Sequence, residues 1–537
     1  MTSSVETDAP SRVSENASSL SFLLFLFVVV IYVAARLWRL TSSCLWFDEL
    51  FGVHAARHDW KHMLQFVAAD LIHPPLFYSL LKIWIAIGGE SLLWLRLLPV
   101  LISVAAIVPI VLLCRALKLN AWQLNLALAL LAVNGYLIKY AQEVRMYSLL
   151  FLLTCTSLWL FVRFIDSTGR VSRVLPALAA VNLLLIYSHY YGWVVVLVEL
   201  VFVMLWRRDR ASKLRLTTLA LGFSYLPWLY LITLAKEPGR GLAQNIGWVS
   251  RPGLRDLGQF FALLNTPFFF RQSSGGSLND IWSFTLSLVL FGVPLALLFR
   301  EVVRRKRSVE REAWILLGLF VLPIVLVLIL SWVLPYSVWG TRHLIITAAP
   351  YAILAAIALN RLRLAWLRTT CLALIAGWVL LNGVLTLVVR PTNFTWCTWE
   401  PLAQQVVQVE TSNTQPVHVY AFEDLVAYHL WFAFEDAAKR SGGTNNFRVH
   451  VAKGIPGLRE DPAYFLPRRF YEIETQDGAT FRGDTIWLAF RASQWNPGQP
   501  PLSLIAPQGF ETGRIFQLRA QGQESVLVEL RRKAASQ

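Results

Sequence analysis

Apolar stretches of about twenty residues, separated by short polar loops, recur through the first three quarters of the chain. A helix of that length matches the hydrocarbon thickness of a bilayer. The pattern therefore predicts a polytopic α-helical membrane protein with about eleven transmembrane helices. We place these spans at about 20–40, 92–114, 119–138, 146–165, 174–188, 190–206, 215–235, 281–299, 313–334, 343–359 and 367–389.

One further apolar segment is too short to be a full span. Residues 75–88 read PLFYSLLKIWIAIG and begin with the second proline of a pair. A short stretch with aromatic anchors is typical of an interfacial or re-entrant helix. We therefore predict interfacial helix within the first outer loop, residues 41–91.

Basic residues mark alternate loops between the predicted spans. The formal net charge is +16, although only 15% of the residues are charged and 56% are hydrophobic. Lys and Arg concentrate in cytoplasmic loops, which places these loops and the tail at 1–19 in the cytoplasm and everything after residue 389 outside. We expect no nucleic-acid partner, because the charge lies in short loops rather than on one domain. The clusters are Arg115 with Lys118, Arg170 with Arg173, Arg207 to Arg215, Arg300 to Arg311, and Arg361 to Arg368.

The last segment, residues 390–537, has the pattern of a separate extracytoplasmic α/β domain. Alternating or β-branched runs predict strands at Val417–Ala421, Thr485–Phe490 and Ser525–Leu530, and Asp424–Lys439 has helical character. Residues 20–389 would then form the transmembrane catalytic domain.

The five cysteines include no CxxC pair. Cys44 and Cys397 fall on the same predicted side of the membrane and could pair, but we favour two free thiols. The other three lie inside apolar runs, where packing explains them.

Paired carboxylates follow the first predicted span. Asp48 and Glu49 stand in the sequence WFDEL. Acids at a membrane surface must be solvated, paired with cations, or used in chemistry. The plain explanation is a helix N-terminus that an acid stabilises, with aromatic residues at the interface.

A second acid and a cation are predicted on the same side. Glu143 and Arg145 follow the third predicted span, where an interfacial ion pair is the plain explanation. Together with Asp48 they suit a reaction on a lipid-linked phosphate. Arg can contact two phosphate oxygens, and a carboxylate can accept the proton of an attacking hydroxyl. One carboxylate with a phosphate leaving group suits single displacement with inversion.

Histidines also gather near outward turns. His73 precedes the proline pair, His189 lies in the sequence YSHYYGW, and His343 follows Arg342 after a short outer loop. A lone interfacial histidine is usually just a solvated residue. Three of them near outward turns indicate a polar cavity.

These motifs together resemble bacterial family 39 glycosyltransferases. The sequences WFDEL, HPPLFYSLLKIW, LRLLPVL, YAQEVRMYSL, YSHYYGW and TRHLIITAAPY occur in the family's order and spacing, over about residues 20–360. The family consists of GT-C type membrane enzymes related to protein O-mannosyltransferases and to the lipid A aminoarabinose transferase. The resemblance implies a helical bundle with an outward-facing cavity beneath amphipathic segments of the first loop.

The resemblance assigns the acids. Asp48 matches the family's catalytic base, and Glu49 is its usual acidic neighbour, which shapes the site. Glu143 matches the acid of the second outer loop and completes the predicted catalytic set.

The resemblance also suggests binding residues. Arg145, His73 and Arg342 would face the donor phosphate, and Tyr147, His189 and Tyr190 would bind substrate. The aminoarabinose transferase has a metal-associated Glu just before the residue that His73 replaces, whereas this chain has Ile72 there. We therefore assign no metal ligand and leave a divalent metal open as a cofactor.

The function implied is transfer of a sugar from a polyprenyl-phosphate donor to lipid A or core oligosaccharide, a cell-envelope glycan or a protein, at the outer face of the bacterial cytoplasmic membrane. A lipid-linked glycan ligase or polymerase, which typically relies on a large late outer loop, and a polytopic transporter stay as alternatives. A transporter should carry charges near mid-span, where this chain has only Glu199. The sugar and the acceptor cannot be read from the sequence.

Overall fold

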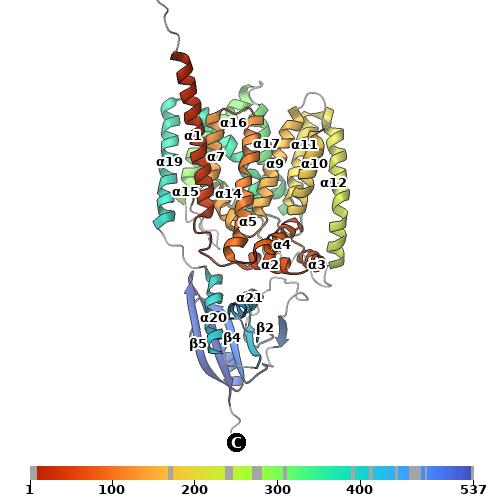
Figure 1. Cartoon of the computed structure of the whole chain (residues 1–537), viewed down its shortest axis with the longest axis vertical. Coiled ribbons are helices and arrows are strands. Elements are labelled where there is room, and N and C mark those ends of the chain that lie inside the picture. Colours follow the sequence, from red (N-terminus) through yellow and green to blue (C-terminus); the bar gives the residue numbers. More distant parts are fainter. Residues whose placement is uncertain are drawn as a thin grey trace, which may run out of the picture.

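A helical bundle and a smaller sheet-containing domain are stacked along the long axis of the molecule (Figure 1). The computed structural model describes residues 9–166, 173–235, 246–268, 281–305, 311–388, 394–410, 415–441, 446–458, 473–477 and 481–533. Within these residues, eight helices are long and apolar enough to cross a membrane. Each predicted span is mostly helical, which confirms the polytopic helical fold class.

The bundle is ordered from a buried centre to an apolar surface. α9 and α18 are almost wholly buried, whereas α1 and α19 expose most of their apolar side chains, as lipid-facing helices do. The helices are α1 (Ala9–Leu37), α5 (Leu92–Ala105), α6 (Ile107–Ala116), α7 (Ala121–Val133), α8 (Gly135–Gln142), α9 (Tyr147–Asp166), α10 (Val174–Ser188), α11 (Tyr191–Trp206), α12 (Arg208–Ala235), α14 (Leu254–Asn265), α15 (Ile281–Ser287), the π-helix η1 (Leu288–Gly292), α16 (Val293–Arg305), α17 (Arg311–Val333), the 3₁₀-helix η3 (Thr341–Thr347), α18 (Ala348–Asn360) and α19 (Ala365–Val388).

Several helix boundaries differ from the predicted ones, and two of these differences concern α1 and the span 119–138. α1 begins at Ala9, inside the predicted tail, and residues 1–8 lie outside the described residues. The predicted span 119–138 is divided into α7 and α8 at Asn134. There the side chain of Asn134 accepts from Leu137 N and donates to the carbonyls of Leu263 and Leu264, so the broken backbone is stabilised by the end of α14. Hydrophobicity alone carries no signal for such a break.

A buried arginine fastens the first helix to this break. Arg36 is fully buried, lies over the ring of Tyr32, and donates to Ser103 Oγ at 2.9 Å. It also donates to the carbonyls of Leu131 and Ala132 at the end of α7. A cation at a helix C-terminus is electrostatically favourable, which explains how the charge is tolerated inside the bundle.

Three short helices form a layer at the end of the bundle that faces the C-terminal domain (Figure 1). They are α2 (Phe47–Arg57), α3 (Trp60–Asp70) and α4 (Leu76–Gly88). α4 has 13 residues and therefore spans about 20 Å, which is less than a bilayer core. We call these three helices the end layer.

The C-terminal domain is built on a six-stranded sheet with the order β3-β2-β1-β4-β6-β5. Strands β3, β2, β1 and β4 run parallel, and β6 and β5 continue the sheet antiparallel. α21 covers the parallel half, where β1 and β4 are largely buried. The elements are η4 (Thr395–Thr398), α20 (Trp399–Val409), β1 (Val417–Ala421), α21 (Asp424–Ser441), β2 (Phe447–Lys453), β3 (Glu474–Asp477), β4 (Thr485–Ala492), α22 (Leu502–Ile505), η6 (Ala506–Gln508), β5 (Phe510–Ala520) and β6 (Gln523–Arg532).

The predicted strands at 417–421, 485–490 and 525–530 and the predicted helix at 424–439 are all present. The sequence analysis missed β2, β3, β5 and α20. The predicted domain boundary at 389/390 falls in residues 389–393, which lie outside the described residues.

The two parts of the molecule are joined covalently and by buried contacts. Cys44 and Cys397 form a disulfide with a Cα–Cα distance of 5.3 Å, so the expectation of free thiols is wrong. Their proximity depends on how the C-terminal domain docks, and residue spacing cannot report that. His54 of α2 also contacts the hydroxyl of Tyr428 at 2.7 Å.

Candidate active site

Asp48 lies in the first turn of α2, at the inner side of the end layer. Its Oδ2 accepts from Arg342 Nη1 at 3.1 Å, although 294 residues separate the two along the chain. The side chain is mostly buried, and Arg342 reaches it from η3. The structure thus brings the first-loop acid and the late arginine into one ion pair, whereas the sequence analysis had assigned Arg342 to the donor phosphate.

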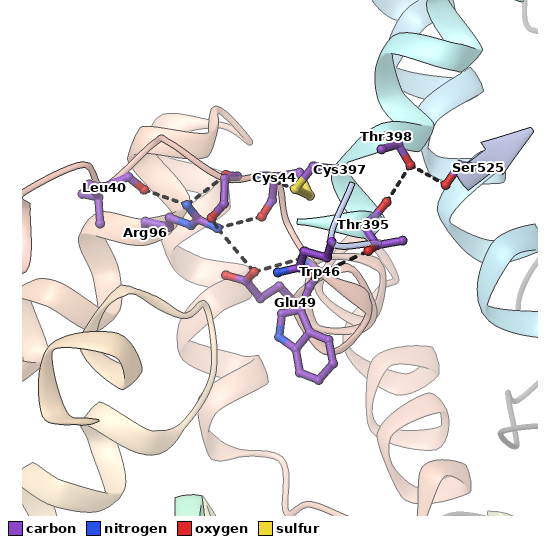
Figure 2. Close-up of a disulfide and its surroundings, with 11 residues drawn as sticks. Leu40, Cys44, Trp46, Glu49, Arg96, Thr395, Cys397, Thr398 and Ser525 are labelled. Atoms are coloured by element: carbon purple, nitrogen blue, oxygen red, sulfur yellow. Dashed lines mark hydrogen bonds and ion pairs between the residues drawn. A yellow bond between two sulfur atoms is a disulfide. The ribbon is translucent and has the colours of Figure 1, made fainter. Parts of the chain in front are cut away.

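Glu49 points elsewhere and is fully engaged (Figure 2). Its Oε2 accepts from Trp46 N at 3.0 Å, which stabilises the N-terminus of α2, and its Oε1 accepts from Val144 N at 2.9 Å. Arg96 lies 3.5 Å from the same carboxylate and also donates to the carbonyl of Cys44. Glu49 therefore holds the first outer loop against the turn that carries Glu143 and Arg145.

Arg145 connects three elements. Its Nη1 donates to the backbone carbonyl of Asp48 at 2.9 Å and to the hydroxyl of Tyr78 at 3.2 Å, and its Nη2 lies 3.3 Å from His73 Nδ1. The guanidinium is almost completely buried. Arg145 therefore contacts the backbone of Asp48, and Arg342 contacts its carboxylate.

Glu143 lies in the turn between α8 and α9, two residues before Arg145. Lys139 Nζ is 3.6 Å from its carboxylate. Burial raises the pKa of Glu143, and the charge of Lys139 opposes that shift. The acid is near Asp48 and Arg342 but contacts neither through a hydrogen bond in the described part of the chain.

Three histidines from distant parts of the chain lie close together next to Arg145. His73 follows α3, His189 separates α10 from α11, and His343 stands in η3, with their nitrogen atoms within 4.8 Å of one another. The ring of His189 is 5.2 Å from that of His73 and 4.7 Å from that of His343. We call these residues the histidine cluster. Three histidine nitrogens at this spacing could hold a metal ion.

The predicted tyrosines occupy different positions. The hydroxyl of Tyr147 is buried without a hydrogen-bond partner among the described residues, and its ring lies 6.2 Å from that of His343. The hydroxyl of Tyr190 donates to the carbonyl of Leu71 at 3.3 Å. Leu71 has a φ of 65°, in the left-handed region, where it turns the chain from α3 towards His73. Tyr190 therefore supports the loop that carries His73.

The sequence analysis did not name Tyr78, Arg96 and Lys139 as site residues, and it named His343 only as part of a polar cavity. Arg96 lies in the LRLLPVL motif and Lys139 directly precedes YAQEVRMYSL. A charged residue inside an apolar run is a usable signal, because burying it requires partners. Tyr78 carries no such signal, since aromatic residues are common in interfacial helices.

The arrangement joins complementary chemical groups in a place with little water. One acid, Asp48, has an oxygen paired with Arg342 and another that makes no hydrogen bond in the described residues. Two guanidiniums lie beside it, and the histidine cluster adjoins Arg145 through His73. Such a site can accept a proton at the carboxylate and stabilise an anion at the cations.

The bundle, its end layer and the C-terminal domain together define a GT-C type membrane-protein fold. The structure is similar to that of ArnT from Cupriavidus metallidurans in the apo state, with a TM-score of 0.56 at 14% sequence identity, over 96% of this chain and 98% of ArnT. ArnT bound to undecaprenyl phosphate matches over the same shares, with a TM-score of 0.54 at 13% identity. This likeness confirms the predicted GT-C fold.

A second solved structure matches over a smaller part. The Archaeoglobus fulgidus oligosaccharyltransferase in the apo form has a TM-score of 0.48 at 15% identity, over 76% of this chain. The match spans 63% of that protein, which is less than two thirds of its length. No protein-family model and no curated protein sequence matches the chain.

Proposed function

We propose that this protein is a glycosyltransferase that moves a sugar from a polyprenyl-phosphate donor to a hydroxyl of an envelope glycan, a lipid such as lipid A with its core oligosaccharide, or a protein. The observation that carries the proposal is the buried contact of Asp48 with Arg342 and the neighbouring Arg145. An acid next to two cations is what proton removal beside an anionic leaving group requires.

The proposed reaction is a single displacement. The acceptor oxygen attacks the anomeric carbon of the sugar, and its proton passes to Asp48. The bond between the anomeric carbon and the phosphate oxygen breaks, and its electron pair leaves on the polyprenyl phosphate, so the anomeric configuration inverts. The lipid phosphate gains one negative charge in this step, and Arg145 and Arg342 stabilise it.

Because Asp48 is paired with Arg342, the donor must bind before Asp48 can act as the base. A donor phosphate is a better partner for a guanidinium than a single carboxylate oxygen, because it offers two oxygens in bidentate geometry. When the phosphate takes Arg342, the Asp48 carboxylate becomes free to accept a proton. Glu49 then acts as a positioning residue, and Glu143, paired with Lys139, lies in the turn that Glu49 holds.

We also propose an orientation of the protein in the membrane. The basic loops predict a cytoplasmic N-terminus, which puts the end layer and the C-terminal domain on the outer face of the bacterial cytoplasmic membrane. The likeness in fold to ArnT, whose structure was solved with undecaprenyl phosphate, supports a polyprenyl-phosphate donor.

Replacing Asp48 with Asn tests the proposal. Asn keeps the shape of the side chain but cannot accept a proton, so we expect transfer to fall by at least about a hundredfold while membrane insertion is kept. Cells that lack the gene would carry the wild type, Asp48→Asn or the control Asp59→Asn, and mass spectrometry would compare their envelope glycoconjugates and polyprenyl-phosphate sugars.

Asp59 is a suitable control because it is an exposed helix cap outside the site, and Asn caps helices equally well. The expected result is loss of one glycan mass and accumulation of one lipid-phosphate sugar with Asp48→Asn alone. Wild-type glycan levels in that variant would remove Asp48 as the base. No difference between wild-type and gene-free cells, in either pool, would overturn the transferase proposal itself.

A further inference from the structure

The helix α2 lies against α21 of the C-terminal domain (Figure 1) and is attached to that domain at both ends. Just before its first residue, Cys44 is bonded to Cys397 of η4. In its last turn, Arg57 Nη1 donates to Glu435 Oε2 of α21 at 2.8 Å. Asp48 stands in the first turn of this helix. The helix that carries the proposed base is therefore held from outside the bundle.

On the side of the C-terminal domain, the disulfide is fixed to the sheet (Figure 2). Two threonines flank Cys397. Thr395 Oγ1 donates to the carbonyl of Ala520 at 3.1 Å, and Thr398 Oγ1 contacts Ser525 Oγ at 2.7 Å. Ala520 ends β5, and Ser525 lies near the start of β6. The short helix η4 is thus fastened to the turn between the last two strands.

On the side of the bundle, Arg96 orders the segment that leads into α2 (Figure 2). Its Nη1 donates to the carbonyl of Leu40 at 2.7 Å, and its Nη2 donates to that of Cys44 at 2.8 Å. The same guanidinium is almost completely buried and lies 3.5 Å from the carboxylate of Glu49. Because unpaired buried donors are unfavourable, Arg96 keeps these acceptors together. A shift of Cys44 is therefore passed to the first turn of α2.

At the other end of α2, a second set of contacts joins it to α21. His54 contacts the hydroxyl of Tyr428 at 2.7 Å. Arg57, besides its bond to Glu435, donates to Glu90 from Nη2 at 2.7 Å and from Nε at 3.0 Å. All three charged side chains are partly buried, and an arginine that contacts both oxygens of a carboxylate binds more strongly than an exposed ion pair. Arg57 thus connects α2, the residues after α4 and the C-terminal domain.

We infer that the C-terminal domain is a positioning element of the active site, which holds α2 at both ends and so sets the place of Asp48 opposite Arg342. This inference rests on the proposed function. A helix of eleven residues depends on its packing for stability. A general base must lie within hydrogen-bond reach of the proton that it accepts, and a misplacement of about 1 Å can lower a rate about a hundredfold.

The two attachments limit the same movement, so their effects should be coupled. Each one restrains α2 while the other is absent, and the loss of both leaves the helix to the end layer alone. The loss of both should therefore cost more than the product of the single losses. Arg57, Arg96 and Glu435 are positioning residues in this scheme, because they act through α2 and not at the reacting atoms.

The test removes each attachment separately and then both together. Cys44→Ser with Cys397→Ser opens the first, and Glu435→Ala opens the second. Glu435→Gln keeps an oxygen acceptor for Arg57 and should behave like wild type. Asp436→Ala is the matched control, because Asp436 is the next residue of α21 and pairs with Arg440 in the same helix.

The first measurement is the initial rate at which the glycan mass appears after each variant is induced in cells that lack the gene. We expect each single opening to lower this rate by about threefold and the combined variant to lower it by at least about 30-fold. Binding of undecaprenyl phosphate to the purified full-length protein in nanodiscs should stay within about threefold of wild type, because the phosphate ligands are carried by other elements.

The second measurement follows α2 itself without any substrate. Hydrogen exchange of the peptide covering residues 47–57 should accelerate at least about tenfold in the combined variant, while exchange in the central helix α9 stays unchanged. If the combined variant does not fold, dithiothreitol added to purified, folded Glu435→Ala opens the half-buried disulfide instead, and exchange of the same peptide should accelerate to the same extent.

A glycan rate within about threefold of wild type in the combined variant would overturn the inference, since Asp48 would then keep its place without the C-terminal domain. Equal losses of glycan rate and of undecaprenyl phosphate binding would also overturn it, because the domain would then support folding in general. Unchanged exchange in α2 after both attachments are opened would have the same meaning. Glycan profiles that do not differ between wild-type and gene-free cells would instead count against the proposed function.

Discussion

Asp48 and Glu49 show how far neighbouring residues of one type can differ in role. Successive residues on a helix point about 100° apart, so one acid turns to Arg342 and the other to Trp46, Val144 and Arg96. The sequence analysis predicted that Asp48 is the reactive acid and Glu49 its support, through the family resemblance. It could not identify Arg342 as the partner of Asp48, because 294 residues of chain separate them.

Arg145 should matter for the donor more than for the acceptor. In the Arg145→Ala variant, we expect the KM for the lipid-phosphate donor to rise at least about tenfold, because a charge-assisted contact to phosphate is lost. The KM for the acceptor should change little. Steady-state kinetics with each substrate varied in turn measures this.

Arg208→Ala, at an exposed position that begins α12, serves as the control for Arg145→Ala. A kinetic defect that appeared only when the acceptor was limiting would contradict the phosphate assignment of Arg145.

His429 of the C-terminal domain should make the stability of the protein depend on pH. It is buried against the ring of Trp396, and burial lowers its pKa to about 3. The His429 side chain therefore takes up a proton more readily in the unfolded state than in the folded state. The free energy of unfolding keeps its full value above about pH 6.5 and falls by up to about 1.4 kcal/mol for each pH unit below it. We expect the fluorescence-monitored unfolding temperature of the full-length protein to drop between pH 7.5 and pH 5.

In His429→Gln this drop should become smaller, because the group that must take up a proton is gone. An unchanged pH dependence would mean that other groups, such as His450, control acid stability.

At the scale of elements, periodicity predicted the helices well and the edge strands poorly. Long apolar runs such as Glu312–Val333 admit few alternatives to a helix. β5 was missed because its side chains are mostly exposed, so no buried face enforces an alternating pattern, and a bulge between Thr512 and Ile515 shifts the register. The break at Asn134 was missed because its cause lies in α14, far along the chain.

Glu199, the one acid expected near mid-span, has a structural explanation. It lies in α11 and forms a closed ring with Ser157 of α9 and Asn182 of α10, at contacts of 2.5, 2.6 and 2.8 Å. Ser157 has one hydrogen for its two contacts, which are both to oxygen atoms, and the Asn182 amide donates one hydrogen to the other carboxyl oxygen. The third hydrogen must come from Glu199, so the acid is protonated in the ring and fastens three helices together.

This ring predicts an isosteric rescue. Glu199→Gln supplies the missing hydrogen permanently and should keep the unfolding free energy within about 1 kcal/mol of wild type. Glu199→Leu removes the carboxyl contacts of Ser157 and Asn182, leaves the buried Asn182 amide N–H unpaired and should cost about 2 kcal/mol or more. Thermal unfolding in detergent compares the two. Greater damage from Gln than from Leu would mean that the acid is ionised.

At the scale of the molecule, the sequence analysis anticipated the bundle, the helix at 75–88 within the end layer and the α/β domain, because each follows from local patterns. It favoured free thiols at Cys44 and Cys397, and they are bonded. Docking between domains depends on the complementary shapes of their surfaces. Residue periodicity reports only local structure, so it cannot predict how the domains dock. The histidine cluster was missed for a similar reason, since its three members come from three parts of the chain that lie far apart in the sequence.

The orientation in the membrane can be tested with two single cysteines. Arg304→Cys lies at the end of α16 and Lys533→Cys after β6, both at exposed positions. The three native thiols, Cys114, Cys155 and Cys371, are buried and should give little background. In intact cells, or spheroplasts where an outer membrane intervenes, an impermeant maleimide should label position 533 and spare position 304. The opposite labelling would reverse the proposed topology.

Formation of the disulfide between Cys44 and Cys397 also reports whether each molecule has inserted correctly into the membrane. It can close only when the chain between the two residues crosses the bilayer an even number of times, and only after the last crossing helix has been made. A single misplaced helix would strand one thiol in the cytoplasm, where disulfides rarely persist. Gel mobility without reductant would therefore count correctly threaded molecules, even for variants that have lost all activity.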